Sequence, residues 1–282
     1  MRIAALLLVH HRPDLLELLL TRLSLPLWRA YVHLDRRSDA AQFDFVRTHA
    51  ELVPDAVAVY WGHFSIVAAT LSLMRAAIRD PANTHFYLMS GQCYPVMLDG
   101  AIERFVARAG RGDLISLVPM PHLTKPLSRL TEFHVLPQVR FGRFRRLIQS
   151  VMRLLPARDV QRLLRGIVPF AGSGWWLLSR TTVDRMLTFL DENRWFEQAF
   201  RHSQCADEMF FQTLFIHLGF TPNGQSPTAV RWSGKSEHPE LIDADLFAAL
   251  TREACHVMAR KFSTFHPTTR LNTPDLPNCA SG

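Results

Sequence analysis

Short apolar runs alternate with longer amphipathic runs over the first 120 residues of the chain. The short runs are rich in β-branched and aromatic residues and predict strands at residues 3–9, 30–34, 56–60, 85–89 and 113–118. The longer runs repeat apolar residues at helical spacing and predict helices at residues 13–23, 40–49, 65–79 and 99–109. This order predicts an α/β fold with a mainly parallel central sheet, whose ligands bind beyond the carboxyl ends of the strands.

The pattern loosens after residue 119, where prolines and many arginines predict a helical insertion at one edge of the fold. Beyond the insertion we predict extended segments at residues 172–180, 230–232 and 259–262, and helices at 181–190, from 207 onward and at 243–256. We therefore predict one domain over residues 1–265 with an Arg-rich insertion at about 120–168. The polar tail at 266–282 is expected to lie loosely on the surface.

Composition is consistent with one large core, because 48% of the 282 residues are hydrophobic. No run approaches the roughly 20 apolar residues that span a bilayer. The opening ten residues are interpreted as a buried strand and not as a signal peptide, because their apolar core is short and lacks a small-residue cleavage site. The four cysteines lie far apart with no C-x-x-C pair, so we expect free thiols in a cytoplasmic protein.

The net charge of +7 does not predict nucleic-acid binding, because only three of the 32 basic residues are lysines and the arginine bias is attributed to codon usage. The position of the arginines is more informative. Eight of them, interleaved with leucine and other apolar residues, lie at 140, 143, 145, 146, 153, 158, 162 and 165. Pro156 and Pro169 predict two short helices here. Two interpretations stay open: a solvated helix face, or a surface for anionic lipid or a phosphorylated acceptor.

The acidic pair Asp207-Glu208 precedes apolar residues at helical spacing, which predicts that both acids lie in the first turn of a buried helix. There the helix dipole favours an ionised carboxylate. About thirty residues earlier, the paired rings of Trp175 and Trp176 are more aromatic surface than a core strand needs. Flat rings beside a carboxylate suggest a sugar-binding site. The alternative, that the two acids only cap a helix, also fits this segment.

Two further segments could bind a nucleotide. Asp35 follows a predicted strand and could accept hydrogen bonds from uracil or ribose, and Arg37 could reach a phosphate. Arg260 and Lys261 could hold a diphosphate leaving group without a metal ion. Taken alone, Asp35 could equally be a turn residue and the cation pair could be surface charge.

Two patterns resemble nucleotide or metal motifs without fitting them. Residues 229–236 end like a P-loop, but Ala229 replaces the first glycine. Asp243-Ala244-Asp245 has the D-x-D form with which many sugar transferases hold Mn²⁺, but it begins an amphipathic helix, so we interpret it as a cap. The thirteen histidines show no metal-ligand spacing. We therefore predict no metal site and no cofactor.

Seven motifs, in this order, resemble those of the core-2/I-branching β-1,6-N-acetylglucosaminyltransferases and the related peptide O-xylosyltransferases, glycosyltransferase family 14. They span about residues 3–263. The motifs are H-x-x-P-x-x-L from His10 or His11, HLDRRS at 33–38, WGHFS at 61–65, SGQCYP at 90–95, GSGWW at 172–176, ADEMFF at 206–211 and ARKF at 259–262.

The resemblance implies a single GT-A type (Rossmann-like) domain, a UDP-sugar donor and inversion at the anomeric carbon without a metal. It implies Glu208 as the general base, and Asp207 remains the alternative base because the helix phase is uncertain by one residue. The implied donor-binding residues are Val9, Asp35, Arg37, Arg260 and Lys261. The implied acceptor- or sugar-binding residues are Trp61, Gly62, Tyr94, Gly174, Trp175 and Trp176.

Three departures from the family pattern affect the expected substrates and location. Gly174 stands where xylosyltransferases carry an acid, Cys93 stands where many members have Asp, and no N-terminal anchor precedes the first strand. We expect a bacterial enzyme in the cytoplasm, either free or peripheral at the inner face of the membrane, that transfers N-acetylglucosamine to a hydroxyl of a glycan or lipid-linked glycan. Two alternatives stay open: a UDP-xylose-dependent xylosyltransferase, and a non-catalytic glycan- or lipid-binding subunit.

Overall fold

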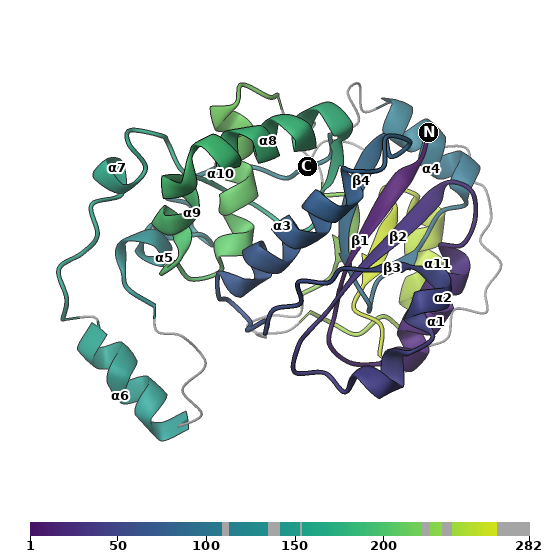
Figure 1. Ribbon diagram of the computed structural model, residues 1–282, viewed down its shortest axis with the longest axis horizontal. Helices are drawn as coiled ribbons and strands as arrows, with labels where there is room; N and C mark the ends of the chain where they lie inside the picture. Colours follow the sequence, from purple (N-terminus) through teal and green to yellow (C-terminus); the bar gives the residue numbers. More distant parts are fainter. Residues whose placement is uncertain (109–112, 135–141, 153, 222–225, 233–238, 264–282) are drawn as a thin grey trace.

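A five-stranded sheet with the order β3-β2-β1-β4-β8 lies at the centre of the protein (Figure 1). The computed structural model describes residues 1–108, 113–134, 142–152, 154–221, 226–232 and 239–263. The strands are β1 (Ile3–Val9), β2 (Trp28–Leu34), β3 (Glu51–Leu52), β4 (His85–Ser90) and β8 (Leu177–Ser179). Only β8 runs antiparallel to its neighbour, so the predicted α/β class with a mainly parallel sheet is confirmed.

Helices cover both faces of this sheet because the side chains of its strands point alternately to opposite sides. In β1, Ala4 and Leu6 belong to one buried cluster, whereas Ala5 and Leu7 belong to another. The first cluster is completed by α3 (Ser65–Ala77), α8 (Arg180–Glu192), α9 (Arg194–Phe200) and α10 (Phe210–His217). The second is completed by α1 (Pro13–Arg22), α2 (Val46–His49) and α4 (Asp99–Arg108).

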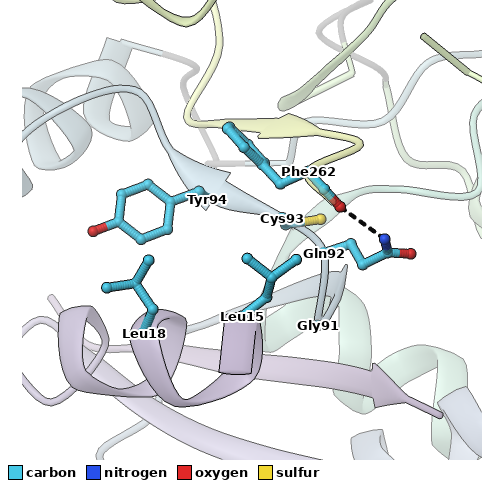
Figure 2. Close-up of a pocket in the computed structure, with 7 residues that line it drawn as sticks. All are labelled: Leu15, Leu18, Gly91, Gln92, Cys93, Tyr94 and Phe262. Carbon is cyan, nitrogen blue, oxygen red and sulfur yellow. Dashed lines mark hydrogen bonds between the residues drawn. The ribbon is translucent and has the colours of Figure 1, made fainter. Parts of the chain in front are cut away.

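A second, three-stranded sheet attaches the end of the chain beside the first. It has the order β5-β10-β9, with α11 packed on it. The elements are β5 (Tyr94–Pro95), β9 (Thr228–Val230), α11 (Ala244–Glu253) and β10 (Met258–Arg260). The Gln92 side-chain amide donates to the Phe262 carbonyl oxygen over 2.7 Å (Figure 2). The Phe262 amide also donates to the Gln92 carbonyl oxygen over 3.1 Å. The turn after β4 therefore fixes the residues that follow β10.

The predicted insertion begins and ends at one short antiparallel sheet, β6 (Val118–Pro119) with β7 (Phe170–Ala171). Its helices are α5 (Ser128–Thr131), α6 (Gly142–Met152) and α7 (Val160–Leu163). Two short helices in the Arg-rich stretch, α6 and α7, agree with the prediction from its prolines. In Figure 1, α6 stands apart from the rest of the protein.

Three elements predicted within the first 120 residues differ from the observed ones. The third strand is β3, which ends before Pro54, because a proline nitrogen cannot donate to a strand ladder. Residues 56–60 instead bond to side chains at the end of β2. The predicted helix at 40–49 is divided into the 3-10 helix η1 (Ala40–Phe43) and α2. The predicted strand at 113–118 is reduced to an isolated bridge at Leu114 and to β6.

Cys93 and Cys205 are free thiols, as expected, whereas Cys255 is disulfide-bonded, which corrects the expectation for that residue. The predicted tail at 266–282 lies outside the described residues, so its separation from the domain stays a prediction. Across the described part of the chain, no helix is both long and apolar enough to cross a membrane.

Candidate active site

The acidic pair lies in a separate 3-10 turn, η2 (Ala206–Glu208), and not in the first turn of α10 as predicted. Cys205 before the turn has a φ of 51°, and Met209 after it leaves helical geometry with a φ of −135°. Tertiary contacts hold this conformation: the Cys205 amide donates to the Gly62 carbonyl oxygen, and the Gly172 amide donates to the Glu208 carbonyl oxygen, both over 2.8 Å. Position in the fold, and not the dipole of α10, therefore sets the environment of the two acids.

The GSGWW segment passes so close to other chain segments that Gly172 has no room for a side chain and Gly174 has little. A Cβ atom on Gly172 would overlap the Ser116 carbonyl oxygen. A Cβ atom on Gly174 would lie 3.0 Å from Oδ2 of Asp207, which is closer than side chains ordinarily approach. The WGHFS segment reaches the same turn through Gly62, which has a φ of 70°. Three motifs that are separate in the sequence thus meet at the acidic turn.

Two cations from the insertion bind the side chain of Glu208. Lys125 Nζ and Arg129 Nη1 both contact Oε2 of Glu208, the second over 2.5 Å. Among the described residues these are the only partners of the carboxylate, so Oε1 remains available to a ligand. The Glu208 side chain is 27% exposed, so a ligand can reach it. Sequence reasoning missed both cations, and the sole hint was that Lys125 is one of three lysines.

Asp207 has a different environment from its neighbour. Its Oδ1 atom is buried and has no hydrogen-bond partner among the described residues. Burial, and then the negative charge of Glu208, raise the pKa of Asp207 to about 7. The adjacent carboxyl groups are therefore suited to different tasks at neutral pH, because Asp207 holds a proton far more readily than an ordinary aspartate.

Arg260, the last residue of β10, lies over the ring of Trp175, with the guanidinium carbon 4.5 Å from the ring centroid. Its Nε atom is buried without a partner in the described part of the chain. Burial lowers the pKa of Arg260, and the charge of Asp207 opposes that shift. Burial, and then Arg260, lower the pKa of Lys261. The structure thus brings Trp175, Asp207 and the cation pair together.

The other predicted donor-side residues gather where β1 and β2 end. Val9 closes β1, and its carbonyl oxygen accepts from the Asp35 amide over 2.8 Å. Arg37 donates to both carboxylate oxygens of Asp35, over 3.1 and 2.7 Å, and lies over the ring of Tyr60. The Val59 amide also donates to Asp35, whose side chain is nearly inaccessible. The carboxylate of Asp35 and the guanidinium of Arg37 are therefore already paired with each other.

Two histidines that the prediction of site residues omitted lie at the same edge. The rings of His10 and His11 are 3.9 Å apart. Burial is the main reason that the pKa of His10 is lowered, and Asp35, Lys261, Arg37 and Arg260 all act on it electrostatically. Burial, and then His10, lower the pKa of His11 to about 4. Their position after a strand was the signal that could have identified them.

The predicted aromatic residues take three different positions. Trp61 is 66% exposed beside Gly62, where it can contact a ligand. Trp176 is fully buried and packs on Phe211, so it is the member of the tryptophan pair that belongs to the core. Tyr94 packs edge-on against Phe247 and Phe262, in the layer between the second sheet and α11. Tyr94 also lines a small pocket with Leu15, Leu18 and Cys93 (Figure 2), and its expected sugar contact stays a prediction.

The D-x-D pattern is a helix cap. The Asp243 side chain accepts a hydrogen bond from the Leu246 amide over 2.9 Å at the start of α11, which confirms that interpretation. Within the described ranges, no group of three or more His, Cys, Asp or Glu side chains could hold a metal ion. Metal-independent chemistry stays a prediction.

Comparison with solved structures gives matches of low similarity. Mannose-1-phosphate geranyltransferase from Thermus thermophilus has 13% sequence identity and a TM-score of 0.36, and the match covers 80% of this chain and 72% of that one. A 4-diphosphocytidyl-2C-methyl-D-erythritol synthase has 10% identity and a TM-score of 0.39, with coverage of 89% and 98%. Matches at this level say nothing about the chemistry of this chain.

A search of curated protein sequences found no match. The family comparison is decisive, because the sequence model of the Core-2/I-Branching enzyme matches residues 3–259. That span includes β1, the GSGWW segment and the acidic turn, and it ends one residue before Arg260. The chain therefore belongs to the Core-2/I-Branching enzyme family, which is a family of glycosyltransferases.

Proposed function

We propose that the protein transfers a sugar, N-acetylglucosamine in the first instance, from a UDP-sugar to a hydroxyl of a glycan or glycolipid acceptor, with inversion and with Glu208 as the general base. One observation carries the proposal: the carboxylate of Glu208 is accessible and is held through Oε2 by two cations, which keeps Oε1 free. The Oδ1 atom of Asp207 beside it is buried, and its Oδ2 atom lies next to Gly174, which suits Asp207 less well to act as the base.

The proposed reaction is a single displacement. The acceptor hydroxyl oxygen forms a bond to C1 of the sugar from the face opposite UDP, and the bond between C1 and the diphosphate oxygen breaks. The hydroxyl proton moves to Oε1 of Glu208 and then to solvent. The positive charges of Lys125 and Arg129 hold the carboxylate in one orientation before the acceptor arrives.

Arg260 and Lys261 would stabilise the diphosphate as negative charge develops on it. Both side chains have a lowered pKa, chiefly because burial disfavours their charged forms. A bound diphosphate supplies the missing counter-charge. The unpartnered Nε atom of Arg260 gives it a hydrogen-bond donor for this purpose. Cys93 stands in place of an acid, so that position places no carboxylate in competition for the guanidinium.

If these two cations take the place of a divalent metal, EDTA should leave the rate of transfer unchanged. The check is UDP release, measured after removal of metals and again with added Mn²⁺. Asp243→Ala serves as the matched control, because Asp243 caps α11 and should affect stability without creating a metal requirement. A loss of activity in EDTA that Mn²⁺ restores would refute the metal-free mechanism.

The donor is tested with a panel of UDP-sugars that includes UDP-N-acetylglucosamine and UDP-xylose. A ligand that binds the native state at 100 times its Kd adds about 2.7 kcal/mol to the free energy of unfolding, so the true donor should raise the melting temperature most. Release of UDP only when an acceptor is also present would support transfer. Binding without release under any condition would favour the alternative of a non-catalytic glycan- or lipid-binding subunit.

We also propose that the insertion holds the enzyme at an anionic membrane surface where a lipid-linked acceptor would lie. Helix α6 carries three arginines and no acidic residue, and in Figure 1 it projects from the rest of the protein. Leu147 in α6 and Leu154 just after it are 59% and 84% exposed. Arg158, in the same Arg-rich stretch, has a structural role, because its side chain donates hydrogen bonds to the carbonyl oxygens of Leu130 and Ala199.

This proposal specifies an anionic membrane surface and not a compartment. A cytoplasmic location remains the expectation from sequence.

Salt-sensitive binding to vesicles that contain an anionic lipid is the expected result for the full chain. Each arginine near such a surface contributes about 1 kcal/mol, so several suffice for reversible attachment. Combined Arg143→Gln, Arg145→Gln and Arg146→Gln should abolish binding and preserve activity on a small soluble acceptor. Arg47→Gln in α2 is the matched control, because Arg47 is exposed on a different helix. If the wild type ignores these vesicles at low salt, the proposal fails.

A further inference from the structure

Unpartnered buried polar atoms gather around the acidic turn. The described residues contain seven such side-chain atoms. Three of them belong to the acidic turn, α10 and the end of β10: Asp207 Oδ1, Gln212 Oε1 and Arg260 Nε. Because folded proteins rarely leave buried polar atoms without a partner, this concentration points to a ligand.

A glycine and an arginine lie close to the carboxyl group of Asp207. A Cβ atom on Gly174 would lie 3.0 Å from Oδ2 of Asp207, so glycine at this position leaves that oxygen without a side chain against it. The residue after Gly174 is Trp175, and the guanidinium group of Arg260 stacks on its ring. Oxygen atoms beside a flat ring can bind the hydroxyl groups and the apolar face of a sugar. Because Arg260 is the proposed diphosphate contact, the sugar closest to Asp207 is the one attached to that diphosphate.

The mechanism proposed above leaves Asp207 without a task, since Glu208 takes the proton. Burial and the adjacent negative charge raise the pKa of Asp207 to about 7. A protonated carboxyl group can both donate and accept a hydrogen bond, whereas an ionised one can only accept. The titratable and charged groups that act on Asp207 from the turn, from the insertion and from β10 are Cys205, Glu208, Lys125, Arg129 and Arg260.

We propose that Asp207 binds a hydroxyl of the transferred sugar as a neutral carboxylic acid, and that together with Gly174 it determines which donor sugar fits. The inference rests on the proposed function and assigns the two neighbouring acids separate roles: Glu208 acts on the acceptor and Asp207 on the donor. It makes Asp207 a specificity residue and not a second base.

The first test compares the wild type with Asp207→Asn, whose amide is also neutral and hydrogen-bonds in a similar shape. The measurement is the affinity for UDP-N-acetylglucosamine and UDP-xylose relative to UDP alone, by calorimetry from pH 6 to 9. In the wild type, the affinity for the preferred UDP-sugar relative to UDP should decrease as the pH rises. The decrease should be up to about tenfold per pH unit once the pH exceeds the value at which the Asp207-Glu208 pair loses its proton. Asp207→Asn should keep the preference at all pH values.

The second test is Gly174→Ala, which keeps both acids and adds only a methyl group against Oδ2 of Asp207. It should weaken binding of the preferred UDP-sugar at least tenfold and leave the affinity for UDP unchanged. Thermal unfolding without ligand shows whether the variant folds.

Three outcomes would overturn the proposal: an equal pH dependence in the wild type and Asp207→Asn, no preference for either UDP-sugar over UDP, or loss of transfer but not of binding in Asp207→Asn. The last would make Asp207 the base. None of them by itself refutes glycosyl transfer, which UDP release in the presence of an acceptor measures separately.

Discussion

Glu208→Gln is expected to lower the rate of sugar transfer by about 10²–10⁴-fold, the usual contribution of a general base. The amide keeps the shape of the side chain, but it offers no basic oxygen to the acceptor hydroxyl. Arg129 and Lys125 lie on the Oε2 side of the carboxylate, away from the proposed site of proton transfer. The affinity for UDP should therefore be unchanged, because the proposed diphosphate contacts come from β10 and the residue after it. Transfer is measured as UDP release, and UDP binding by calorimetry.

Glu253→Gln is the matched control for this substitution. Glu253 forms an exposed ion pair with Arg231 at the end of α11 and takes no part in the proposed site, so transfer should be preserved. An active Glu208→Gln together with an inactive Asp207→Asn would contradict the prediction and assign the base to Asp207. Thermal unfolding is measured alongside, because the glutamine variant leaves Lys125 and Arg129 without their carboxylate partner.

Lys261→Met should have the second largest effect, a loss of about 10²–10³-fold in kcat, as for other groups that stabilise developing negative charge. Unlike Glu208→Gln, it should also weaken UDP binding. Lys261→Arg is the matched variant, because it keeps the charge and should retain much of both properties. Lys261 is preferred to Arg260 for this test, since Arg260 stacks on Trp175 and its removal would disturb packing.

The pH dependence provides an independent check of the same residue. Burial and Arg260 lower the pKa of Lys261, so the free protein loses this positive charge at a lower pH than an ordinary lysine would. The charged form exists below the pKa, so the affinity for UDP should fall as the pH rises through the lowered value. Lys261→Arg should bind UDP with less dependence on pH in that range. Equal affinity for UDP in the wild type and Lys261→Met would exclude Lys261 from the donor site.

Local patterns were sufficient for the central elements of the fold. The predicted strand at 3–9 coincides with β1, and the predicted helices at 13–23 and 65–79 overlap α1 and α3 closely. These elements bury one face or both faces along their whole length, so the spacing of their apolar residues records their structure. The strand predicted at 56–60 failed because its apolar residues lie beyond Pro54, in a segment that bonds to side chains and not to a strand ladder.

The sequence by itself determined the α/β class, the order of the motifs and the residue types available for catalysis. It did not determine the conformation of the acidic turn, which depends on hydrogen bonds from Cys205 to Gly62 and from Gly172 to Glu208. It also could not identify the partners of Glu208, because Lys125 and Arg129 lie 83 and 79 residues earlier in the chain. The spacing of apolar residues indicates which face of a segment packs against the core. The charge and solvation of a side chain depend instead on which distant segments surround it. Only the tertiary structure therefore decided that Glu208 is accessible and paired with cations, while the neighbouring Asp207 carries a buried oxygen that has no partner among the described residues.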